Sequence, residues 1–502
     1  MRLRGALLAA CVGLGGFGLT SIGACSNPTG SGGATTTMGN ATTAASSSKT
    51  STHTSATGTA NGGGGAGGNG TVTNVSSSAS GTTCGTPHCL DWVRIFDGNP
   101  GTLGPPSMAV DASNNTWVLG SLTGSANFGI HTLSTVKKAP LLVELGPYGD
   151  ALRADLIGAN DEAFFMGMAR SKAGPFFAFG IHRANVDFGN GVTLTAVNVY
   201  NTFLVAYDAS GKAKWVRDGD IQPFAIAADG AGSVLLAGNA GHGTFDGHSL
   251  VGPPPSAGFV MKYDSAGTWQ WTTLLGSTQT EFVFAAATDS ANDIVVGDND
   301  VSTYGFVTVK KLDHTTGTVV WSVPVPTPYS VGKAQTAAID ASNTAHLAGF
   351  QVAGPDGHGG WVGPPFLFDV DTNGSPVLAD SLLLQKGDGQ QWASSMALDG
   401  GGHVAMTGAF GGTLDLDVPI TATGAHEIFF AVLSEGAPPT PSWGRRVGGT
   451  AYDVNTGDGQ QNVAYDTAGN LLLATDFGGT ADFGAGPTTP ATRSLAIAKY
   501  KP

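Results

Sequence analysis

The residues whose spacing could bind a metal ion lie in one short segment. Asp369, Asp371 and Asn373 alternate, Gly374 follows, and Asp380 stands at the twelfth position. Oxygen ligands at alternate positions, with a glycine for a sharp turn, suit a hard cation such as calcium. An ordinary Asx-rich turn between two strands has the same composition without metal. Calcium is therefore one interpretation of this segment, and we expect no other cofactor.

Familiar catalytic motifs are absent from the sequence. It contains no G-x-S-x-G elbow, no H-E-x-x-H pair and no G-x-x-x-x-G-K-[ST] loop, and its 11 histidines are scattered. Acid pairs such as Asp298/Asp300 and Asp415/Asp417 lie at strand ends or turns, and distant acids could converge as in a glycoside hydrolase. We expect no enzymatic activity, with a glycan-active hydrolase or lyase as the less favoured alternative.

The charge of the chain argues against nucleic acid as a partner. The formal net charge is −14, only 12% of the residues are charged, and no cluster of Lys and Arg stands out. Binding to phosphate backbones needs concentrated positive charge.

The chain begins with a segment typical of export. Arg2 and Arg4 precede an apolar run, residues 5–21, that is too short to span a bilayer comfortably. The run ends in Ile22-Gly23-Ala24-Cys25, which resembles the lipobox of bacterial lipoproteins. The resemblance implies that residues 1–24 are a signal peptide and that a lipid on Cys25 anchors the protein. By the sorting rule of that family, Ser26 favours the outer membrane. An ordinary secretory signal with a chance cysteine is the alternative.

Residues 25–83 are expected to be a disordered linker. After Cys25 the segment consists almost entirely of Ser, Thr, Gly, Ala and Asn. It has too little apolar surface to offset the entropy of folding. Cys84 and Cys89 follow the linker, and an exported protein favours a small disulfide loop between them. A metal pair with His88 is the rival interpretation.

From Leu90 onward the sequence repeats. One signature is an apolar strand that ends in Asp, a short turn, and a second apolar strand that ends near Gly. Seven segments carry it: 109–120, 169–180, 227–238, 287–297, 338–349, 397–408 and 464–475. In the weakest copy Ser171 replaces the Asp. Such periodicity is the mark of a repeat fold.

A second hairpin lies between successive copies of the first. Examples are FLVAYDASGKAKWVR (203–217) and FVMKYDSAGTWQWTT (259–273). Each repeat therefore contains four short strands with turn residues at every reversal. Four-stranded units repeated radially form a β-propeller. The sequence predicts an all-β, seven-bladed propeller over residues 84–502.

The two ends of this domain complement each other. The last repeat stops after its third strand, at residues 495–502, and the missing fourth strand is found in residues 90–98. Trp92-Val93-Arg94 matches Trp215-Val216-Arg217 of a complete repeat. We therefore expect the N-terminal strand to close the last blade, which removes the exposed edges of an open array.

These repeats resemble the SBBP-type β-propeller repeat proteins of bacterial envelopes. The resemblance rests on hairpins such as VDASNN and FLVAYDASGKAKWVR, and on the D-F-G-x-G-P element of residues 185–191 and 481–487. It covers most of residues 90–502 and implies a fold, but no shared reaction. The Asp–Gly–Trp spacing also resembles the docking repeat of quinoprotein propellers and of the propeller lipoprotein of the barrel-assembly machine. That similarity implies that five tryptophans pack between blades: Trp92, Trp215, Trp271, Trp321 and Trp443.

The loops differ in length between the two faces expected for the ring. Connections on one face are short, whereas those on the other include the longer segments 123–139, 239–258, 351–365 and 411–426. Variable loops on a rigid frame commonly carry function. We therefore expect a lipid-anchored envelope protein that binds a surface protein or glycan on its long-loop face. A scaffold in outer-membrane assembly is the alternative function, and loops that only connect strands are the alternative for this face.

Overall fold

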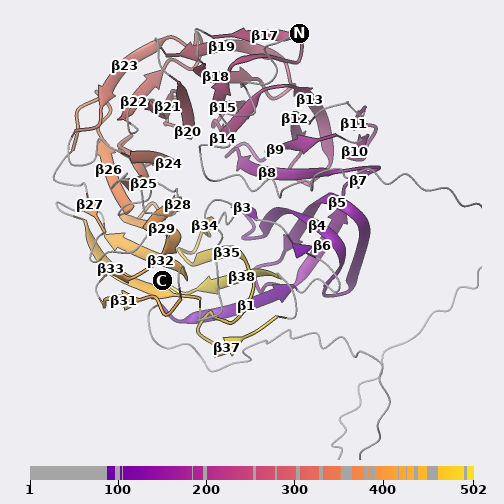
Figure 1. Ribbon diagram of the computed structural model, residues 1–502, viewed down its shortest axis with the longest axis vertical. Helices are drawn as coiled ribbons and strands as arrows, with labels where there is room; N and C mark the ends of the chain where they lie inside the picture. The colour runs from indigo at the N-terminus through magenta and orange to yellow at the C-terminus, as the bar shows by residue number, and fades with distance from the viewer. Residues whose placement is uncertain are drawn as a thin grey trace, which may run out of the picture. The chain divides into compact units, whose positions relative to one another are not determined.

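The computed structural model describes residues 88–96, 102–103, 106–183, 185–195, 200–252, 256–276, 280–300, 306–326, 332–351, 365–377, 382–384, 391–416, 418–424, 427–434, 439–448, 462–490 and 494–502. In these residues the secondary structure is β-strand, arranged as a propeller of antiparallel blades (Figure 1). None of them forms a helix that is long and apolar enough to cross a membrane.

Each blade is named here after its innermost strand. The β3 blade contains β3 (Ser107–Val110), β4 (Thr116–Phe128), β5 (His131–Leu145) and β6 (Ala151–Leu156), with β2 (Thr102–Leu103) also paired to β4. The β8 blade contains β8 (Ala163–Arg170), β9 (Phe176–His182), β12 (Asn201–Tyr207) and β13 (Ala213–Gly219). The β14 blade contains β14 (Gln222–Ala228), β15 (Val234–Ala240), β18 (Ala257–Tyr263) and β19 (Trp269–Leu275).

The remaining blades follow the same order. The β20 blade contains β20 (Glu281–Thr288), β21 (Ile294–Asp300), β22 (Phe306–Leu312) and β23 (Val319–Pro324). The β24 blade contains β24 (Gly332–Ile339), β25 (Ala345–Gln351), β26 (Pro365–Val370) and β27 (Leu382–Leu383). The β28 blade contains β28 (Gln391–Leu398), β29 (His403–Phe410), β32 (Glu427–Ser434) and β33 (Thr440–Arg446). The β34 blade contains β34 (Asn462–Tyr465), β35 (Leu471–Phe477), β38 (Ser494–Tyr500) and β1 (Leu90–Phe96).

The sequence predicted four strands in each repeat. The structure contains these strands and also short additional strands, which form further hairpins and small sheets. They are β7 (Gly158–Ala159), β10 (Val186–Asp187), β11 (Thr193–Leu194), β16 (His242–Phe245), β17 (His248–Val251), β30 (Thr413–Leu414), β31 (Ile420–Thr421), β36 (Ala481–Asp482) and β37 (Pro487–Thr488). Most of them are hairpins between the second and third strands of a blade. The sequence predicted long loops for several of these hairpin segments.

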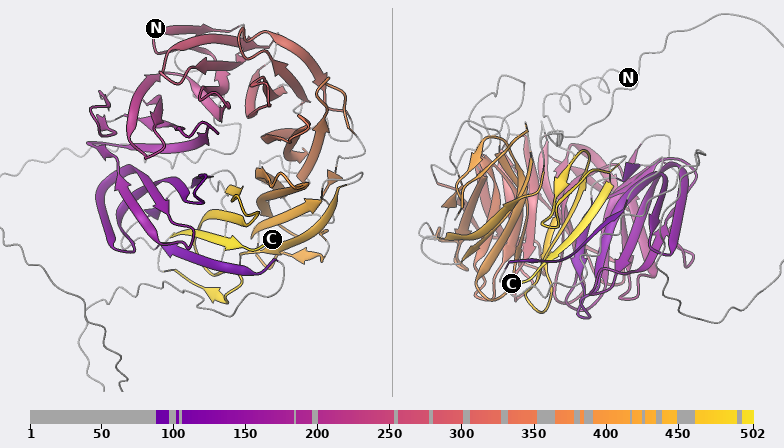
Figure 2. Two further views of the ribbon diagram at one scale, coloured as in Figure 1. Left: turned by 180° about the vertical axis from the view of Figure 1, so that it is seen from behind. Right: turned by 90° about the horizontal axis from the view of Figure 1, so that it is seen from below.

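The blades are arranged in a closed circuit. Each innermost strand contacts the innermost strands of the two neighbouring blades, and the circuit returns through β34 and β3. The side view in Figure 2 shows the strands of the ring running between two faces. We call the face with the turns 111–115, 146–150 and their equivalents the turn face, and the opposite one the loop face.

The ends of the chain share one sheet, as predicted. β1 pairs antiparallel with β38, with Val93 opposite Ala498 and Arg94 opposite Ile497. The prediction that the N-terminal strand completes the last blade is therefore confirmed. Backbone hydrogen bonds between His88, Cys89 and Lys501 extend this pairing past the strand ends.

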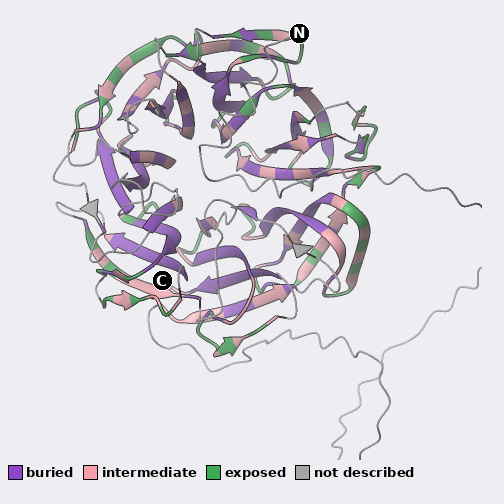
Figure 3. Ribbon diagram, in the orientation of Figure 1, coloured by how far each residue is buried: buried purple, intermediate pink, exposed green. Residues whose placement is uncertain are grey.

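Burial explains why the middle strands lack the usual alternation of apolar and polar residues. Every residue of β15 and β18 is buried, because neighbouring blades cover both faces of each sheet (Figure 3). The innermost strands β14 and β20 instead alternate, with one set of side chains buried between blades. The other set is partly exposed toward the axis of the ring, and the candidate site lies there.

Tryptophans fasten the blades to one another on the turn face. The Nε1 atoms of Trp92, Trp215, Trp271 and Trp321 each donate to a carbonyl of a turn in the next blade, at 3.1 Å in every case. The turn carries a glycine against the indole ring: a Cβ atom on Gly267, which has φ +80°, would lie 2.6 Å from the ring of Trp215. The repeated Asp-x-x-Gly…Trp spacing therefore encodes contacts between blades.

In two further blades the contact with the next blade differs from the Trp–carbonyl hydrogen bond. In β6 Arg153 stands where β13 has Trp215, and its Nη1 donates to the carbonyls of Ser210 and Gly211. Trp443 faces the closing blade, where the chain ends replace a turn, and it stacks on His88 with ring centroids 4.7 Å apart.

The short hairpins fasten the blades on the loop face. Gly219 at the end of β13 pairs with Phe245 of β16, which belongs to the next blade, and β7 pairs with β10 in the same way. The hairpin turns bury an aromatic side chain: Phe128, Phe188, Phe245 and Phe483 are at most 6% exposed. These residues mark the N-F-G, D-F-G and T-F-D-G elements of the sequence, so those elements have a structural role.

Buried ion pairs connect the first turn of a blade to its third strand. Asp229 and Lys262 lie 3.0 Å apart, and Asp289–Lys311 and Asp466–Lys499 lie 2.7 Å apart. Burial alone would raise the pKa of Asp229, but Lys262 and the Ser233 amide outweigh it and hold this pKa below its usual value. The β8 blade has Ser171 and Ala206 at these positions, so it has neither charge of the pair.

Lys262→Met should destabilise the domain by about 3–5 kcal/mol, because it leaves Asp229 buried without its partner. The double variant Asp229→Ser with Lys262→Ala copies the β8 blade and should cost less than the single variant. Urea denaturation measures both free energies of unfolding. A double variant less stable than Lys262→Met would contradict this account. Because the pKa of Asp229 is lowered by folding, its stabilisation should be present above about pH 4 and decline at lower pH.

Candidate ligand-binding site

The innermost strands carry a β-bulge near the loop face. In β8, β14, β20, β24 and β28 one extra residue interrupts the pairing with the second strand: Met166, Phe224, Phe284, Gln335 and Ser394. Two residues before each bulge lie Phe164, Gln222, Phe282, Lys333 and Trp392. Bulges change the aim of side chains and are common beside functional sites. We call these ten residues the axial cluster.

Aromatic rings dominate one side of the axial cluster. Phe282 and Phe284 on β20 are nearly parallel, with an interplanar angle of 8° and centroids 5.6 Å apart. Phe224 on β14 lies 4.7 Å from Phe284 and 5.6 Å from Phe282. All three side chains are partly exposed, whereas Val283 and Ala285 between and beside them are buried. The cluster thus presents an aromatic surface that is not fully buried in the hydrophobic core.

Lys333 lies at the edge of this aromatic surface. Its Nζ atom is 5.4 Å from the ring centroid of Phe284 and 6.0 Å from that of Phe350. These are its interactions within the described residues, which give it no hydrogen bond and no carboxylate partner. Burial lowers the pKa of Lys333, with no acidic group to oppose the effect. Lys138 of β5 similarly lies 3.9 Å above the ring of Phe164.

Amide side chains complete the chemistry of the cluster. Gln222 is exposed and Gln335 is partly exposed, at positions that the β20 blade fills with Phe282 and Phe284. Each amide offers both donors and an acceptor. The cluster therefore combines aromatic faces, amides and a cation at equivalent positions of several blades. Such a surface can bind a ligand that is apolar on one face and polar at its edges.

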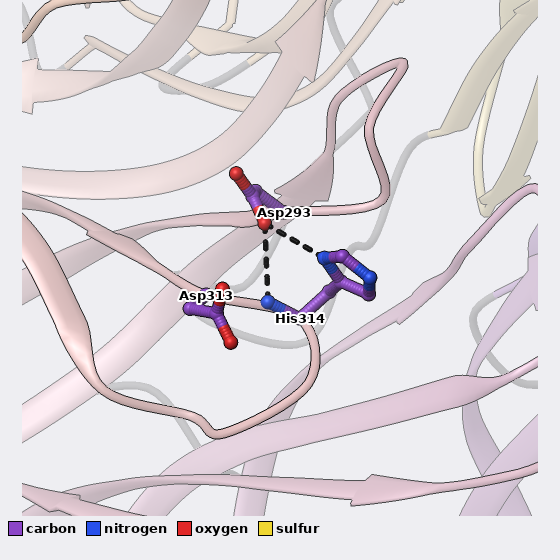
Figure 4. Close-up of side chains that lie close together, drawn as sticks. All are labelled: Asp293, Asp313 and His314. Carbon is purple, nitrogen blue, oxygen red and sulfur yellow. Dashed lines mark hydrogen bonds and ion pairs between the residues drawn. The ribbon is translucent and has the colours of Figure 1, made fainter.

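The described residues include one cluster with the composition of a metal site. Asp293, Asp313 and His314 lie close together on the turn face of the β20 blade (Figure 4). Their ligand atoms already have partners: Asp293 accepts from the His314 amide at 3.1 Å and contacts its Nδ1 at 2.9 Å. Lys311 lies 3.3 Å from Asp293, and Asp313 accepts from the amides of its own turn. The arrangement is therefore two neighbouring turns that hydrogen-bond to each other and to their own backbone.

The segment considered for calcium is described only in part, as the end of β26 and the turn that follows it. Asp371 accepts hydrogen bonds from the amides of Asn373 and Ser375, as the Asp of an Asx turn does. Asp369 is buried and lies 2.9 Å from His346 Nδ1. Asp380 is outside the described residues, so calcium at this segment stays a prediction.

Other residues singled out in the sequence are placed only in part. Cys25 and Cys84 lie outside the described residues, so the lipid anchor and the disulfide with Cys89 stay predictions. Asp298 is buried beside Lys310, and burial raises its pKa despite that lysine. Asp415 is exposed, and Asp417 is not described. The role of these acid pairs therefore stays a prediction.

The axial cluster is not recognisable from the sequence. Its members stand five and seven residues before the Asp, or Ser171, of each repeat signature. All of these positions except Met166 carry an aromatic or polar residue, but the strands otherwise resemble ordinary alternating segments. The sequence favoured the long loops as the binding surface. Several of these loops form the hairpins that connect neighbouring blades.

Comparisons with known proteins leave the family unassigned. No family model matches the chain, and no curated protein matches it. A solved structure of a mitotic checkpoint complex is 11% identical, covering 83% of this chain and 93% of that chain, with a TM-score of 0.44. A protein of unknown function from Dyadobacter fermentans is 11% identical, covering 82% and 97%, with a TM-score of 0.40. At these TM-scores the similarities support no conclusion about function.

Proposed function

We propose that this chain is a non-enzymatic binding module of the bacterial cell envelope, which binds a glycan or surface protein at the axial cluster. The observation that carries the proposal is the partly exposed aromatic surface of Phe224, Phe282 and Phe284 on bulged innermost strands. A rigid ring of blades would hold this surface in a fixed geometry, which lowers the entropic cost of binding.

The proposal includes the architecture and the anchor expected from the sequence. The ring would have seven blades of the SBBP type, in keeping with seven copies of the repeat signature. A lipid on Cys25 would hold the protein at the outer membrane, and residues 26–83 would separate the ring from the lipid surface. A Cys84–Cys89 disulfide would lie just before the closing strand β1.

The double variant Phe282→Ala with Phe284→Ala should weaken ligand binding at least tenfold, because aromatic anchors dominate the energetics of such surfaces. Titration calorimetry against neutral and acidic oligosaccharides, together with affinity capture from solubilised envelopes, first identifies which class binds. The control is Tyr148→Ala, which removes an exposed aromatic residue from the turn face. Undiminished binding by the double variant would place the ligand elsewhere and overturn the proposed site.

A further inference from the structure

The position of Lys333 is unusual within the repeats. The equivalent residues of the β20, β14, β8 and β28 blades are Phe282, Gln222, Phe164 and Trp392, all uncharged. The buried or half-buried lysines Lys262, Lys310 and Lys311 have acidic partners, whereas half-buried Lys138 lies over the ring of Phe164. Within the part of the chain that the structure describes, the ammonium group of Lys333 has only the rings of Phe284 and Phe350 as partners. A cation kept in this setting costs stability in the unliganded protein.

A matching ligand would supply the missing negative charge. It would also need an apolar face for the parallel rings of Phe282 and Phe284, and hydroxyl groups for the amides of Gln222 and Gln335. A hexuronate meets all three needs: its C–H face stacks on an aromatic ring, its hydroxyls bond to amides, and its carboxylate pairs with an ammonium group. A neutral sugar leaves Lys333 without a partner, and an apolar peptide leaves the amides unused.

We infer that the axial cluster binds an acidic glycan, with a hexuronate carboxylate paired to Lys333 and the sugar ring stacked on Phe284. The inference rests on the proposed function and specifies its ligand class. The pairing removes the cost of the isolated cation only when ligand is bound, so the acidic group contributes to selectivity as well as to affinity.

Titration calorimetry of the mature chain with oligogalacturonides of defined length tests this inference. The same oligomers as methyl esters keep the sugar rings and lose the charge. Wild-type protein should bind the acid at least tenfold more tightly than the ester. Lys333→Gln should reduce affinity for the acid at least tenfold and leave the weak affinity for the ester unchanged. Lys333→Arg should retain binding to within about threefold, since it keeps the charge.

Controls separate this inference from general electrostatics and from the proposed function. Lys137→Gln removes the same charge from an exposed surface lysine, and it should bind like wild type. Equal binding of acid and ester by wild type, equal losses in Lys137→Gln and Lys333→Gln, or no binding of the acid would overturn the inference. If Phe282→Ala with Phe284→Ala still abolishes binding of a neutral glycan or a protein, the proposed function stands while the acidic ligand is wrong.

Discussion

A chain that begins at Gly98, and so lacks β1, should lose most of its folding stability. β1 buries Trp92, Val93 and Phe96, each at most 6% exposed. Burial of three such side chains contributes about 5–9 kcal/mol, which is comparable to the whole stability of a typical domain, about 5–15 kcal/mol. Removal of β1 also leaves β38 as an unpaired edge, and it removes the contact of Trp92 with the β3 blade.

The matched control is a chain that begins at Thr83. It lacks the same signal and linker, but it keeps β1 and both Cys84 and Cys89. Differential scanning calorimetry should show one cooperative transition for this chain, and a broad transition at much lower temperature for the chain that begins at Gly98. Superimposable transitions for the two chains would show that β1 is dispensable for ring closure.

The ring could be predicted from the sequence because its determinants recur. Trp92 was recognised as a fourth-strand residue because Trp215 stands in the same local pattern, and the pairing of β1 with β38 follows. The turns were equally visible: Asp208 and Asp264 each accept backbone amides of their own turn, so these turns are determined by local residues.

The role of the loop-face hairpins could not be predicted, because their partners lie in another blade. β16 meets β13 through a single pair, Gly219 and Phe245, which leaves no periodic signal in either segment. The element around Phe245 was noticed as a repeated motif, but its burial depends on contacts that only the folded ring supplies. The loops consequently looked variable and functional, whereas several are structural.

The axial cluster was missed for a related reason. A bulge adds a residue that changes the direction of the strand, and the sequence of β20, EFVFAAAT, has the composition of an ordinary apolar strand. Nothing in that alternation reveals that Phe282 and Phe284 are partly exposed, or that the facing residue of the next blade is Lys333. The site depends on which strands are innermost, and this is a property of the closed ring.

Trp215→Ala should destabilise the domain by about 3–5 kcal/mol, as truncation of a large buried aromatic residue does. Trp215 is 8% exposed, packs against Phe177 and Tyr263, and donates to the Ser265 carbonyl. Its loss opens a cavity between the β8 and β14 blades that the glycine of the facing turn cannot fill. Trp215→Phe keeps most of the ring and loses the hydrogen bond, so it should cost about 1 kcal/mol for that bond plus a smaller packing loss. Urea denaturation compares the two variants.

The β6 strand suggests a variant that separates two explanations for the stabilisation by Trp215. One is hydrogen bonding to the carbonyls of the facing turn, and the other is burial of the indole ring. There Arg153 and Asp155 occupy the positions of Trp215 and Arg217, and Arg153 reaches two carbonyls of the next turn. Trp215→Arg combined with Arg217→Asp transfers this pair to β13. If carbonyl contacts on the turn fasten the blades, this double variant should be more stable than Trp215→Ala combined with Arg217→Asp, which also loses the Arg217 contacts with Gly267 and Asp246 but has no guanidinium group at position 215. If it is no more stable than Trp215→Ala combined with Arg217→Asp, burial of the indole ring alone accounts for the stabilisation by Trp215.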